Sequence, residues 1–366
     1  MLFFAAVLVL AVAALPMGLP LAPGIALAAP AGKAESSATA LLEKGSSLFD
    51  KGDVAGALRA FDAAVKADPG DARAHYLRGV ALERGGNGVA AAGAYRDALA
   101  RKPDFAEAHN NLGGLMKAQG DVQGAGAAFE AAVKAKPAYA EAQFNLGVVR
   151  DAQGRKPEAV AAYREAVRCK PAEGAYRLNL GAALRRTGDL DGAIAQLTEA
   201  TRLLPQDPMG WVNLGMLLSD KKSYEEAGKA LDKAVKLKPD YALGWNRLGR
   251  VELKRDRVDA AVAAQETARK LDPKNATFAA DLCRALVEKE ATARAIAECR
   301  AAVALDPQSP LARYELGKAL AAKGDCGAAR AELDKFAALP GVKPEAKAQA
   351  AAMAGACGNK APARGR

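Results

Sequence analysis

The segment 106–119 has its apolar residues at the spacing of an amphipathic α-helix. His109, Leu112, Gly113 and Met116 follow at i, i+3, i+4 and i+7, so they share one helical face. The intervening positions hold mostly polar or small residues. The pattern predicts a short helix that buries one side, which we call helix A.

A second helix, helix B, is predicted directly after a turn. Gly120 suits the left-handed position that follows a helix, and Asp121 is a preferred N-cap for the next one. Ala125, Phe129 and Ala132 then mark its buried face. The small residues on both helices predict that the two helices approach closely.

The same pattern recurs every 34 residues, and proline marks the period. A fixed period of this length is typical of a solenoid, in which each hairpin buries its apolar face by stacking on its neighbours. We expect each proline to close helix B and to start the next helix A. The eight prolines are Pro69, Pro103, Pro137, Pro171, Pro205, Pro239, Pro273 and Pro307. The matching glycines of helix A are Gly45, Gly79, Gly113, Gly147, Gly181, Gly215, Gly249 and Gly317.

The recurring residues resemble the tetratricopeptide repeat family. We number repeat positions from the residue 31 before each proline, so that unit 3 has His109 at position 4, Leu112 at 7, Gly113 at 8 and Phe129 at 24. The resemblance covers nine units over residues 38–341. It implies an all-α, right-handed superhelical solenoid of helix-turn-helix repeats. It also implies that positions 2, 5, 6, 9, 12 and 13 line a concave groove.

The chain ends are expected to differ from the repeats. Residues 342–357 are predicted to form a helix that caps the last apolar face. Residues 358–366 are expected to be a basic, disordered tail.

The N-terminus is interpreted as an export signal. Residues 2–15 are wholly apolar, which is the length of a signal-peptide core and shorter than the roughly 20 residues that span a bilayer. A small-x-small motif ends at Ala28, so residues 1–28 are predicted to be a signal peptide and 29–37 a flexible lead-in. The protein is then periplasmic or extracellular. The alternative is a chain anchored to the membrane by residues 1–28; otherwise membrane contact is expected to be transient and confined to that segment.

Composition argues against catalysis. The chain has only two histidines, His75 and His109, and both occupy position 4, where a packing role is expected. It has no glycine-rich phosphate loop, nucleophile elbow or CxxC motif. We therefore predict a protein that is not an enzyme and that uses no cofactor or metal. The net charge of +10 favours acidic partners, but basic residues do not alternate with stacking aromatics, so no specific nucleic-acid binding is expected.

Four of the five cysteines are predicted to pair. Cys283 and Cys299 have their midpoint in the turn of unit 8, so an antiparallel hairpin brings them level. Cys326 and Cys357 bracket the turn before the capping helix in the same way. In an oxidising compartment both pairs are expected to be disulfides. For the first pair, the alternative is two buried free thiols. Cys169 is left over, as a packed or surface thiol.

The candidate binding surface begins with a ladder of asparagines at position 6. A carboxamide both donates and accepts, so it can pair with the backbone of an extended peptide. The alternative is that asparagine is a common choice at this position of the family. The ladder consists of Asn111, Asn145, Asn179 and Asn213.

Beyond the ladder, the groove is expected to become basic. Position 6 changes to Arg247 in unit 7, and Arg250 and Lys254 lie on the same predicted helix; Arg284 follows in unit 8 and Lys318 in unit 9. Such a cluster suits carboxylates or an acidic segment. The alternative is a solvated charged surface.

These features together predict a protein–protein interaction scaffold that binds extended or helical segments of other proteins. Two alternatives remain open. One is a structural subunit of an envelope-assembly or polysaccharide-export machine. The other is polyanion binding through the basic end of the groove.

Overall fold

The computed structural model describes residues 33–357, with side chains from Ser37 onward. Over these residues the chain forms nineteen α-helices and no strand. It divides into two compact units between Leu203 and Leu204, which we call the N-terminal and C-terminal units. The predicted signal peptide and the basic tail lie outside the described residues.

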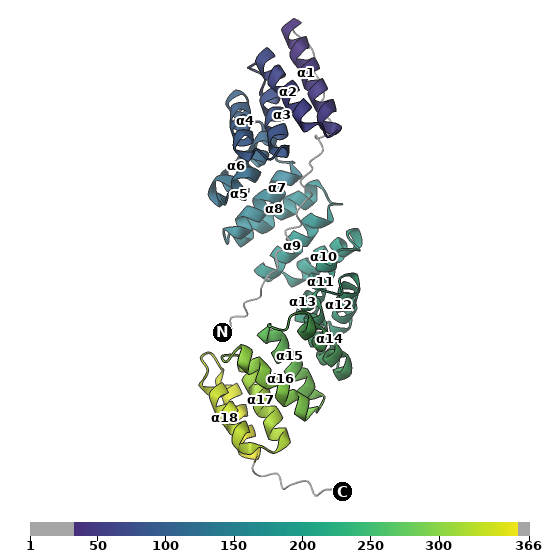
Figure 1. Cartoon of the computed structure of the whole chain (residues 1–366), viewed down its shortest axis with the longest axis vertical. Coiled ribbons are helices and arrows are strands. Elements are labelled where there is room, and N and C mark those ends of the chain that lie inside the picture. Colours follow the sequence, from purple (N-terminus) through teal and green to yellow (C-terminus); the bar gives the residue numbers. More distant parts are fainter. Residues whose placement is uncertain (1–32, 358–366) are drawn as a thin grey trace. The chain divides into compact units, whose positions relative to one another are not determined.

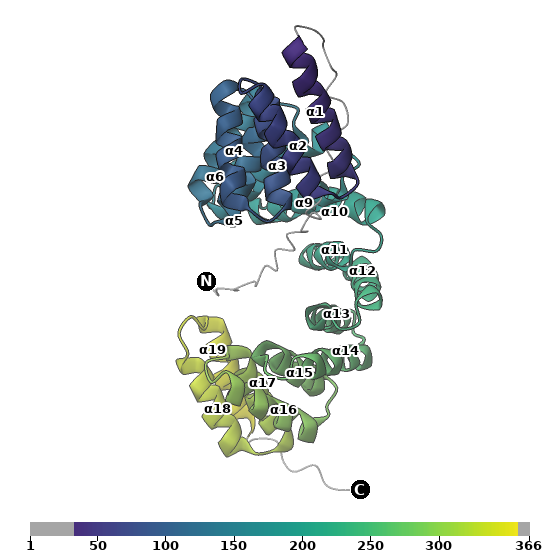
Figure 2. The same cartoon turned by 45° about the horizontal axis from the view of Figure 1, so that its top comes forward.

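The N-terminal unit contains five helical hairpins (Figures 1 and 2). Each A helix packs on its own B helix and on the B helix before it. The hairpins are α1 (Lys33–Asp50) with α2 (Val54–Ala67), α3 (Ala72–Arg84) with α4 (Gly88–Arg101), α5 (Ala106–Ala118) with α6 (Val122–Ala135), α7 (Ala140–Ala152) with α8 (Lys156–Cys169), and α9 (Gly174–Thr187) with α10 (Leu190–Leu203).

The C-terminal unit contains four further hairpins and one last helix (Figure 2). The last helix, α19, packs mainly on α18. The hairpins are α11 (Pro208–Asp220) with α12 (Tyr224–Leu237), α13 (Ala242–Lys254) with α14 (Val258–Leu271), α15 (Ala276–Glu288) with α16 (Thr292–Leu305), and α17 (Pro310–Lys323) with α18 (Cys326–Ala338), followed by α19 (Pro344–Ala356). Each unit is thus an all-α repeat solenoid.

Two sequence-based boundaries need correction. The first helix begins at Lys33, inside the stretch predicted as a flexible lead-in. Lysine, alanine and glutamate after Gly32 are good helix formers, and no proline or glycine interrupts them before Gly45. The prolines also do not start the A helices: Pro137, for example, lies in the turn between α6 and α7.

The glycine at position 8 sets the distance between the two helices of a hairpin. In the second hairpin, a Cβ added to Gly79 would lie 2.6 Å from the ring of Tyr95, which is fully buried. In the third, a Cβ on Gly113 would lie 2.9 Å from Phe129. The ring at position 24 therefore occupies the space that any side chain at position 8 would need.

The turns between helices A and B share one backbone feature. The residue two before the first residue of helix B, such as Gly52 or Gly120, adopts a left-handed conformation. Lys222, Asp256 and Glu290 adopt it at the equivalent places of three hairpins in the C-terminal unit. Glycine takes this conformation without steric cost, whereas other residues do so at a cost of roughly 1–2 kcal/mol. Tertiary packing therefore imposes the turn even where the sequence lacks glycine.

Position 4 has a role that the repeat pattern did not indicate. Its side chain donates a hydrogen bond to the carbonyl of the proline six residues earlier, which ties helix A to the preceding turn. The donors and their distances to that oxygen are His75 Nε2 (3.1 Å), His109 Nε2 (2.9 Å), Gln143 Nε2 (3.1 Å), Arg177 Nε (2.9 Å), Trp211 Nε1 (3.1 Å), Trp245 Nε1 (2.8 Å) and Arg313 Nε (2.8 Å).

Two of the nine units lack this donor. Position 4 of unit 1 is Leu41, and unit 8 is the second exception. It has Ala279 at position 4, which carries no side-chain donor. There the guanidinium of Arg269, from the preceding α14, donates to the carbonyl of Pro273 instead. In all seven residues the donating N–H group is at the ε position of the side chain. This explains why histidine, glutamine, arginine and tryptophan can replace one another at position 4.

The close helix contact predicts a measurable stability difference. Gly79→Ala should lower the free energy of unfolding by roughly 1–3 kcal/mol, because its methyl group overlaps the Tyr95 ring. Gly93, in α4 of the same hairpin, has no atom within 4 Å of an added Cβ, so Gly93→Ala should raise stability by about 0.5–1 kcal/mol. Urea denaturation of both variants checks this. Equal effects would contradict the proposed role of Gly79.

Candidate functional site

The first residue of the asparagine ladder is structural. Asn111 on α5 is 8% exposed. Its Nδ2 lies 3.3 Å from the hydroxyl of Tyr95 and 3.4 Å from that of Tyr76, and its Oδ1 accepts a hydrogen bond from Asn110 at 3.3 Å. The two tyrosine rings cover the carboxamide. Asn111 is therefore a hydrogen-bond partner for buried hydroxyls, not a groove residue as the sequence suggested.

Two ladder residues lie at partly exposed, equivalent positions of successive hairpins. Asn145 on α7 donates from Nδ2 to Oδ1 of Asn110 at 3.0 Å. Asn179 on α9 donates from Nδ2 to the backbone carbonyl of Ala175 at 2.9 Å. Each carboxamide has a second N–H and an oxygen with two lone pairs. Both are half-buried, so these groups can meet a ligand.

The fourth ladder residue, Asn213, lies on α11 in the C-terminal unit and is also half-buried. Because Asn111 is buried and Asn213 belongs to the other unit, only Asn145 and Asn179 of the ladder can form one binding surface.

Aromatic rings and carboxylates surround these asparagines. Phe144 stacks on Tyr176 with ring centroids 4.8 Å apart. Tyr139, directly before α7, lies near the carboxylates of Glu107 and Glu141. Burial raises the pKa of its hydroxyl, and the interactions with Tyr76, Glu141, Glu107 and Tyr176 raise that pKa further. Burial likewise raises the pKa of Tyr76 to about 12.

Both carboxylates are at position 2 and carry ion pairs. Lys136 Nζ lies 3.0 Å from Glu107, and Lys170 pairs with Glu141. We name the surface formed by Glu107, Glu141, Asn145, Leu178 and Asn179 the asparagine face. Sequence analysis identified its asparagines but missed the paired charges beside them.

At two of its five cations, Arg284 and Lys318, the predicted basic end of the groove is a mixed-charge network. Arg284 on α15 donates to Oδ1 of Asp281 at 3.0 Å, and Asp281 is only 2% exposed. Lys318 on α17 donates to Glu288 at 2.6 Å. Asp281 lies at position 6 and Glu288 at position 13, beside cations that both lie at position 9. The sequence-based prediction considered the cations without these acids. Arg247 and Arg250 lie half-buried on α13, one repeat earlier.

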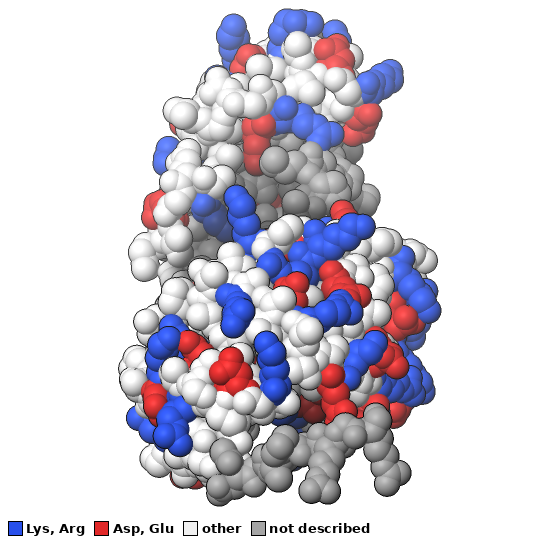
Figure 3. All heavy atoms as spheres, turned by 60° about the horizontal axis from the view of Figure 1, so that its bottom comes forward, with Lys and Arg blue, Asp and Glu red and all other residues white. Residues whose placement is uncertain are grey.

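Charge is also mixed on the molecular surface. On the face shown in Figure 3, Lys and Arg side chains lie interspersed with Asp and Glu side chains. Such a surface gives little reason to expect polyanion binding, which depends on many uncompensated cations.

Glu315 is the least satisfied group of this network. It occupies position 6 on α17, is 5% exposed, and its Oε2 has no hydrogen-bond partner among the described residues. Burial raises its pKa above the ordinary glutamate value; Lys318 and Arg284 oppose that shift, whereas Glu288 and Asp281 add to it.

A second buried polar group is fully bonded. Gln265 on α14 is completely buried at position 24, where the other hairpins carry an aromatic ring, leucine or cysteine. Asn246 donates to Oε1 of Gln265 at 2.9 Å and to Oδ2 of Asp281 at 2.9 Å. Gln265 returns a hydrogen bond to the carbonyl of Asn246 at 3.1 Å. Asn246, Gln265 and Asp281 thus link α13, α14 and α15 through a satisfied buried network.

The structure brings together the sulfurs of both predicted cysteine pairs. Cys283 and Cys299 form a disulfide of 1.97 Å that joins α15 to α16, and both are fully buried. Cys326 and Cys357 form a disulfide of 2.09 Å that joins the start of α18 to the end of α19. Cys169 is a half-buried free thiol, and its burial raises its pKa.

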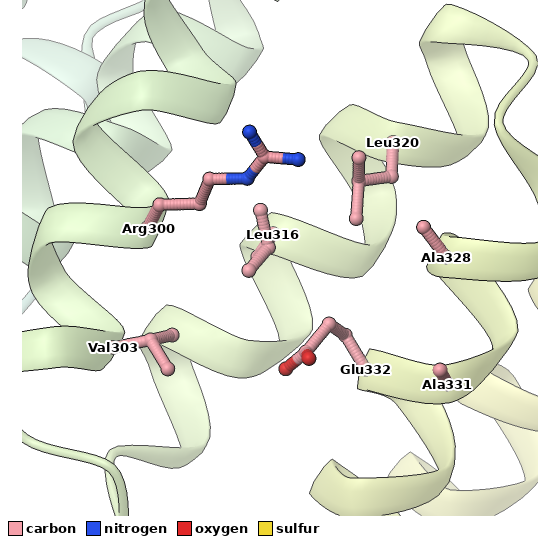
Figure 4. A pocket seen from close by; sticks show the side chains of 7 residues that line it. All are labelled: Arg300, Val303, Leu316, Leu320, Ala328, Ala331 and Glu332. Carbon is pink, nitrogen blue, oxygen red and sulfur yellow. The ribbon is translucent and has the colours of Figure 1, made fainter.

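A cavity of about 290 Å³ lies between α16, α17 and α18 (Figure 4). Leu316, Leu320 and Val303 supply its apolar wall, and Arg300 and Glu332 lie at its rim. Glu332 is already bonded to Arg313 and Lys335, each at 2.7 Å. The cavity reflects the short side chains of Ala328 and Ala331 on α18, and it carries no reactive group.

Within residues 33–357, no group of three or more histidine, cysteine, aspartate or glutamate side chains could hold a metal ion. Among the same residues, no helix has the length and apolar character needed to cross a bilayer.

Comparison with known families identifies the repeat. The tetratricopeptide repeat family model matches residues 42–104, 90–137, 117–174, 178–242, 246–310 and 281–343. These matches cover well over half of the chain. The protein therefore belongs to the tetratricopeptide repeat family.

Several solved structures are similar to this chain at low sequence identity. The Cut9 and Hcn1 hetero-tetramer of APC/C matches 79% of this chain and 57% of its own, with 21% identity and a TM-score of 0.50. YrrB, a tetratricopeptide repeat protein with an unusual peptide-binding site, matches 50% of this chain and 94% of its own, with 20% identity and a TM-score of 0.47. PilF of Pseudomonas aeruginosa matches 57% of this chain and 94% of its own, with 20% identity and a TM-score of 0.49. No curated protein sequence matches the chain.

The burial of Glu315 predicts a pH dependence of stability. A carboxyl whose pKa is raised in the folded state stabilises that state fully below the ordinary glutamate pKa, and this contribution is lost as pH rises through the raised value. The free energy of unfolding of the wild type should therefore fall with rising pH relative to Glu315→Gln. Urea denaturation from about pH 4 to pH 8 measures the difference.

The matched control for this measurement is Glu345→Gln, because Glu345 is exposed in the first turn of α19. This variant makes the same glutamate-to-glutamine change at the surface, so it measures the pH dependence that the substitution itself brings. Parallel curves for the wild type and Glu315→Gln would show that Glu315 titrates alike in the folded and unfolded chains.

Proposed function

We propose that this chain is a non-enzymatic scaffold whose N-terminal unit binds an extended peptide segment of another protein across the asparagine face. Tetratricopeptide repeat proteins in general bind other proteins, and the repeats occupy most of this chain. The observation that carries the proposal is the repetition of half-buried carboxamides, Asn145 and Asn179, at one position of adjacent hairpins.

The spacing of these groups suits an extended backbone. Packed helices lie about 8–10 Å apart, and an extended chain advances about 3.3 Å per residue. A peptide that crosses the A helices would therefore meet one carboxamide for roughly every three residues. Each carboxamide can accept from a peptide N–H and donate to a peptide carbonyl, whatever the peptide's side chains. Leu178, between them in sequence and half-buried, would supply apolar contact.

An acidic ligand is not required by this surface. Two of the five cations that suggested one, Arg284 and Lys318, are paired with Asp281 and Glu288 in the C-terminal unit. We therefore propose recognition of peptide backbone and apolar side chains in the N-terminal unit, in preference to capture of carboxylates in the C-terminal unit.

We also propose that the protein acts outside the cytoplasm, after removal of residues 1–28. Two disulfides in one chain support an oxidising compartment, because cytosolic thiols are kept reduced. The apolar segment 2–15 supports entry into an export pathway.

Removing the two carboxamides should weaken peptide binding. Peptides selected from a random library on the wild-type chain should lose about ten- to hundredfold in affinity for Asn145→Ala/Asn179→Ala, since each lost backbone hydrogen bond is worth about 0.5–1.5 kcal/mol. Fluorescence anisotropy of the selected peptides measures this. Urea denaturation measures the loss of stability expected because Asn145 no longer donates to the buried Asn110, and the affinities are compared where both chains are fully folded.

Two controls separate binding from folding. Val89→Ala alters a residue of α4 that is 80% exposed and should leave both affinity and stability unchanged. Asn111→Ala should lower stability by about 1–3 kcal/mol, because it removes the hydrogen bonds from the carboxamide to the hydroxyls of Tyr76 and Tyr95, of which the second keeps its bond to Glu83. Undiminished peptide affinity in the double variant would remove the asparagine face from the proposal.

Export predicts a defined pattern of processing and thiol content. Intact-mass measurement of the chain recovered from the periplasm or medium should give an N-terminus near Ala29. Alkylation before reduction should modify Cys169 alone, and alkylation after reduction should modify all five cysteines. An intact residue 1–28 segment would favour the anchored form, and five reactive thiols in the native chain would argue against an oxidising compartment.

A further inference from the structure

The last described helix, α19, has the register of the A helix of a tenth repeat. It begins 34 residues after α17, so the two helices share one register. Positions 7 and 11 of α17 are Leu316 and Leu320, and both are buried. The same positions of α19 are Ala350 and Ala354. The helix that closes the stack thus has methyl groups where the preceding A helix has leucine side chains.

The surface under α19 is more apolar than the helix that covers it. Leu333 and Phe336 of α18 are buried there, together with part of Tyr314 from α17, whose ring centroid lies 5.2 Å from that of Phe336. We call Tyr314, Leu333 and Phe336 the end face. Among the described residues of α19, Ala350 and Ala354 are buried against it, and Ala346 and Met353 pack there partly buried.

Since burial of apolar area drives helix packing, two alanines contribute much less than two leucines to holding a helix in place. A short, alanine-rich helix is also marginal on its own in water. Packing alone therefore holds α19 weakly.

A disulfide between Cys326 and Cys357 holds α19 on α18 in addition to this packing. Cys357 follows the last residue of α19, and Cys326 is the first residue of α18. Both cysteines are half-exposed, whereas Cys283 and Cys299 are fully buried. A thiolate must reach a sulfur atom to attack it, so the two disulfides differ in their access to a reductant.

We propose that Cys326–Cys357 is a reducible latch that keeps α19 over the end face, and that the opened end face binds an amphipathic helix with leucines at i and i+4. A dithiol supplies the electrons. Its thiolate attacks one sulfur, the Cys326–Cys357 bond breaks, and its second thiol completes the exchange. Two cysteine thiols form, and the reductant leaves as a disulfide.

The occupant follows from the register of the stack. The end face is the surface that the B helix of each hairpin offers to the next A helix, and the A helices α15 and α17 cover such surfaces with leucines at positions 7 and 11. A partner helix with that spacing would bury more apolar area on Leu333 and Phe336 than α19 does. This is the helix-in-groove mode of recognition.

The latch is tested first by graded reduction of the full chain with dithiothreitol. Mass spectrometry after alkylation should show Cys326 and Cys357 modified before Cys283 and Cys299. At that stage, limited proteolysis should cut within residues 340–356 faster by on the order of a hundredfold, which is the scale of the loop-closure entropy that the cross-link removes. Unchanged protection of α19 after selective reduction would overturn the latch.

The docking step uses two synthetic peptides of sequence 344–356, one native and one carrying Ala350→Leu and Ala354→Leu. The leucine peptide should bind the Cys326→Ser/Cys357→Ser chain at least about tenfold more tightly than the native peptide, the increment expected for added buried apolar area. Neither should bind the oxidised wild-type chain. Equal affinity of the two peptides, or binding to the oxidised chain, would overturn the proposed end face.

A matched control lies in the same unit. The Cys283→Ser/Cys299→Ser chain removes the buried disulfide and should be less stable to urea, yet should not bind the leucine peptide, because its latch remains closed. A chain that binds the peptide equally after loss of either disulfide would show general loosening of the unit, and that result would contradict a specific latch.

Discussion

The contact on which this structure depends is the meeting of a glycine on helix A with a bulky side chain on helix B. Gly79 and Tyr95 show it most clearly, since even a methyl group on Gly79 would enter the ring. This contact fixes the separation of the two helices, and within each unit every hairpin stacks on the next. Where the glycine is absent, another constraint takes its place: in the hairpin of α15 and α16, Cys283 is bonded to Cys299 at the same two positions.

The disulfides and the buried polar groups then distinguish the two units. The N-terminal unit packs aromatic rings at position 24 in its first four hairpins and Leu197 in the fifth, and it presents the asparagine face on its A helices. The C-terminal unit replaces the ring by Gln265 in one hairpin and by Cys299 in another, and it pairs its cations with buried acids such as Asp281. These differences place the proposed peptide site in the N-terminal unit and the proposed reducible latch in the C-terminal one.

The fold could be predicted almost completely from the sequence, whereas the candidate site could be predicted only in part. Repeat position indicates which residues share a face, but not how large their neighbours are. Asn111 and Asn145 occupy the same position, yet Tyr76 and Tyr95 bury the first and leave the second half-exposed. Likewise, position 9 identified Arg284 and Lys318, but their partners became visible only once Asp281 and Glu288 were placed beside them.

The sequence by itself determined the period, the helical hairpins, the cysteine pairing and the family, because each follows from spacing along one helix or across one turn. Only the tertiary structure decided which polar side chains are buried or hydrogen-bonded within the fold and which remain available to a ligand. The N–H of Trp245 bonds the carbonyl of Pro239, and Glu315 is buried without a partner for one oxygen. These outcomes depend on contacts between separate helices, and the free energy of such contacts is set by the neighbours that packing brings together.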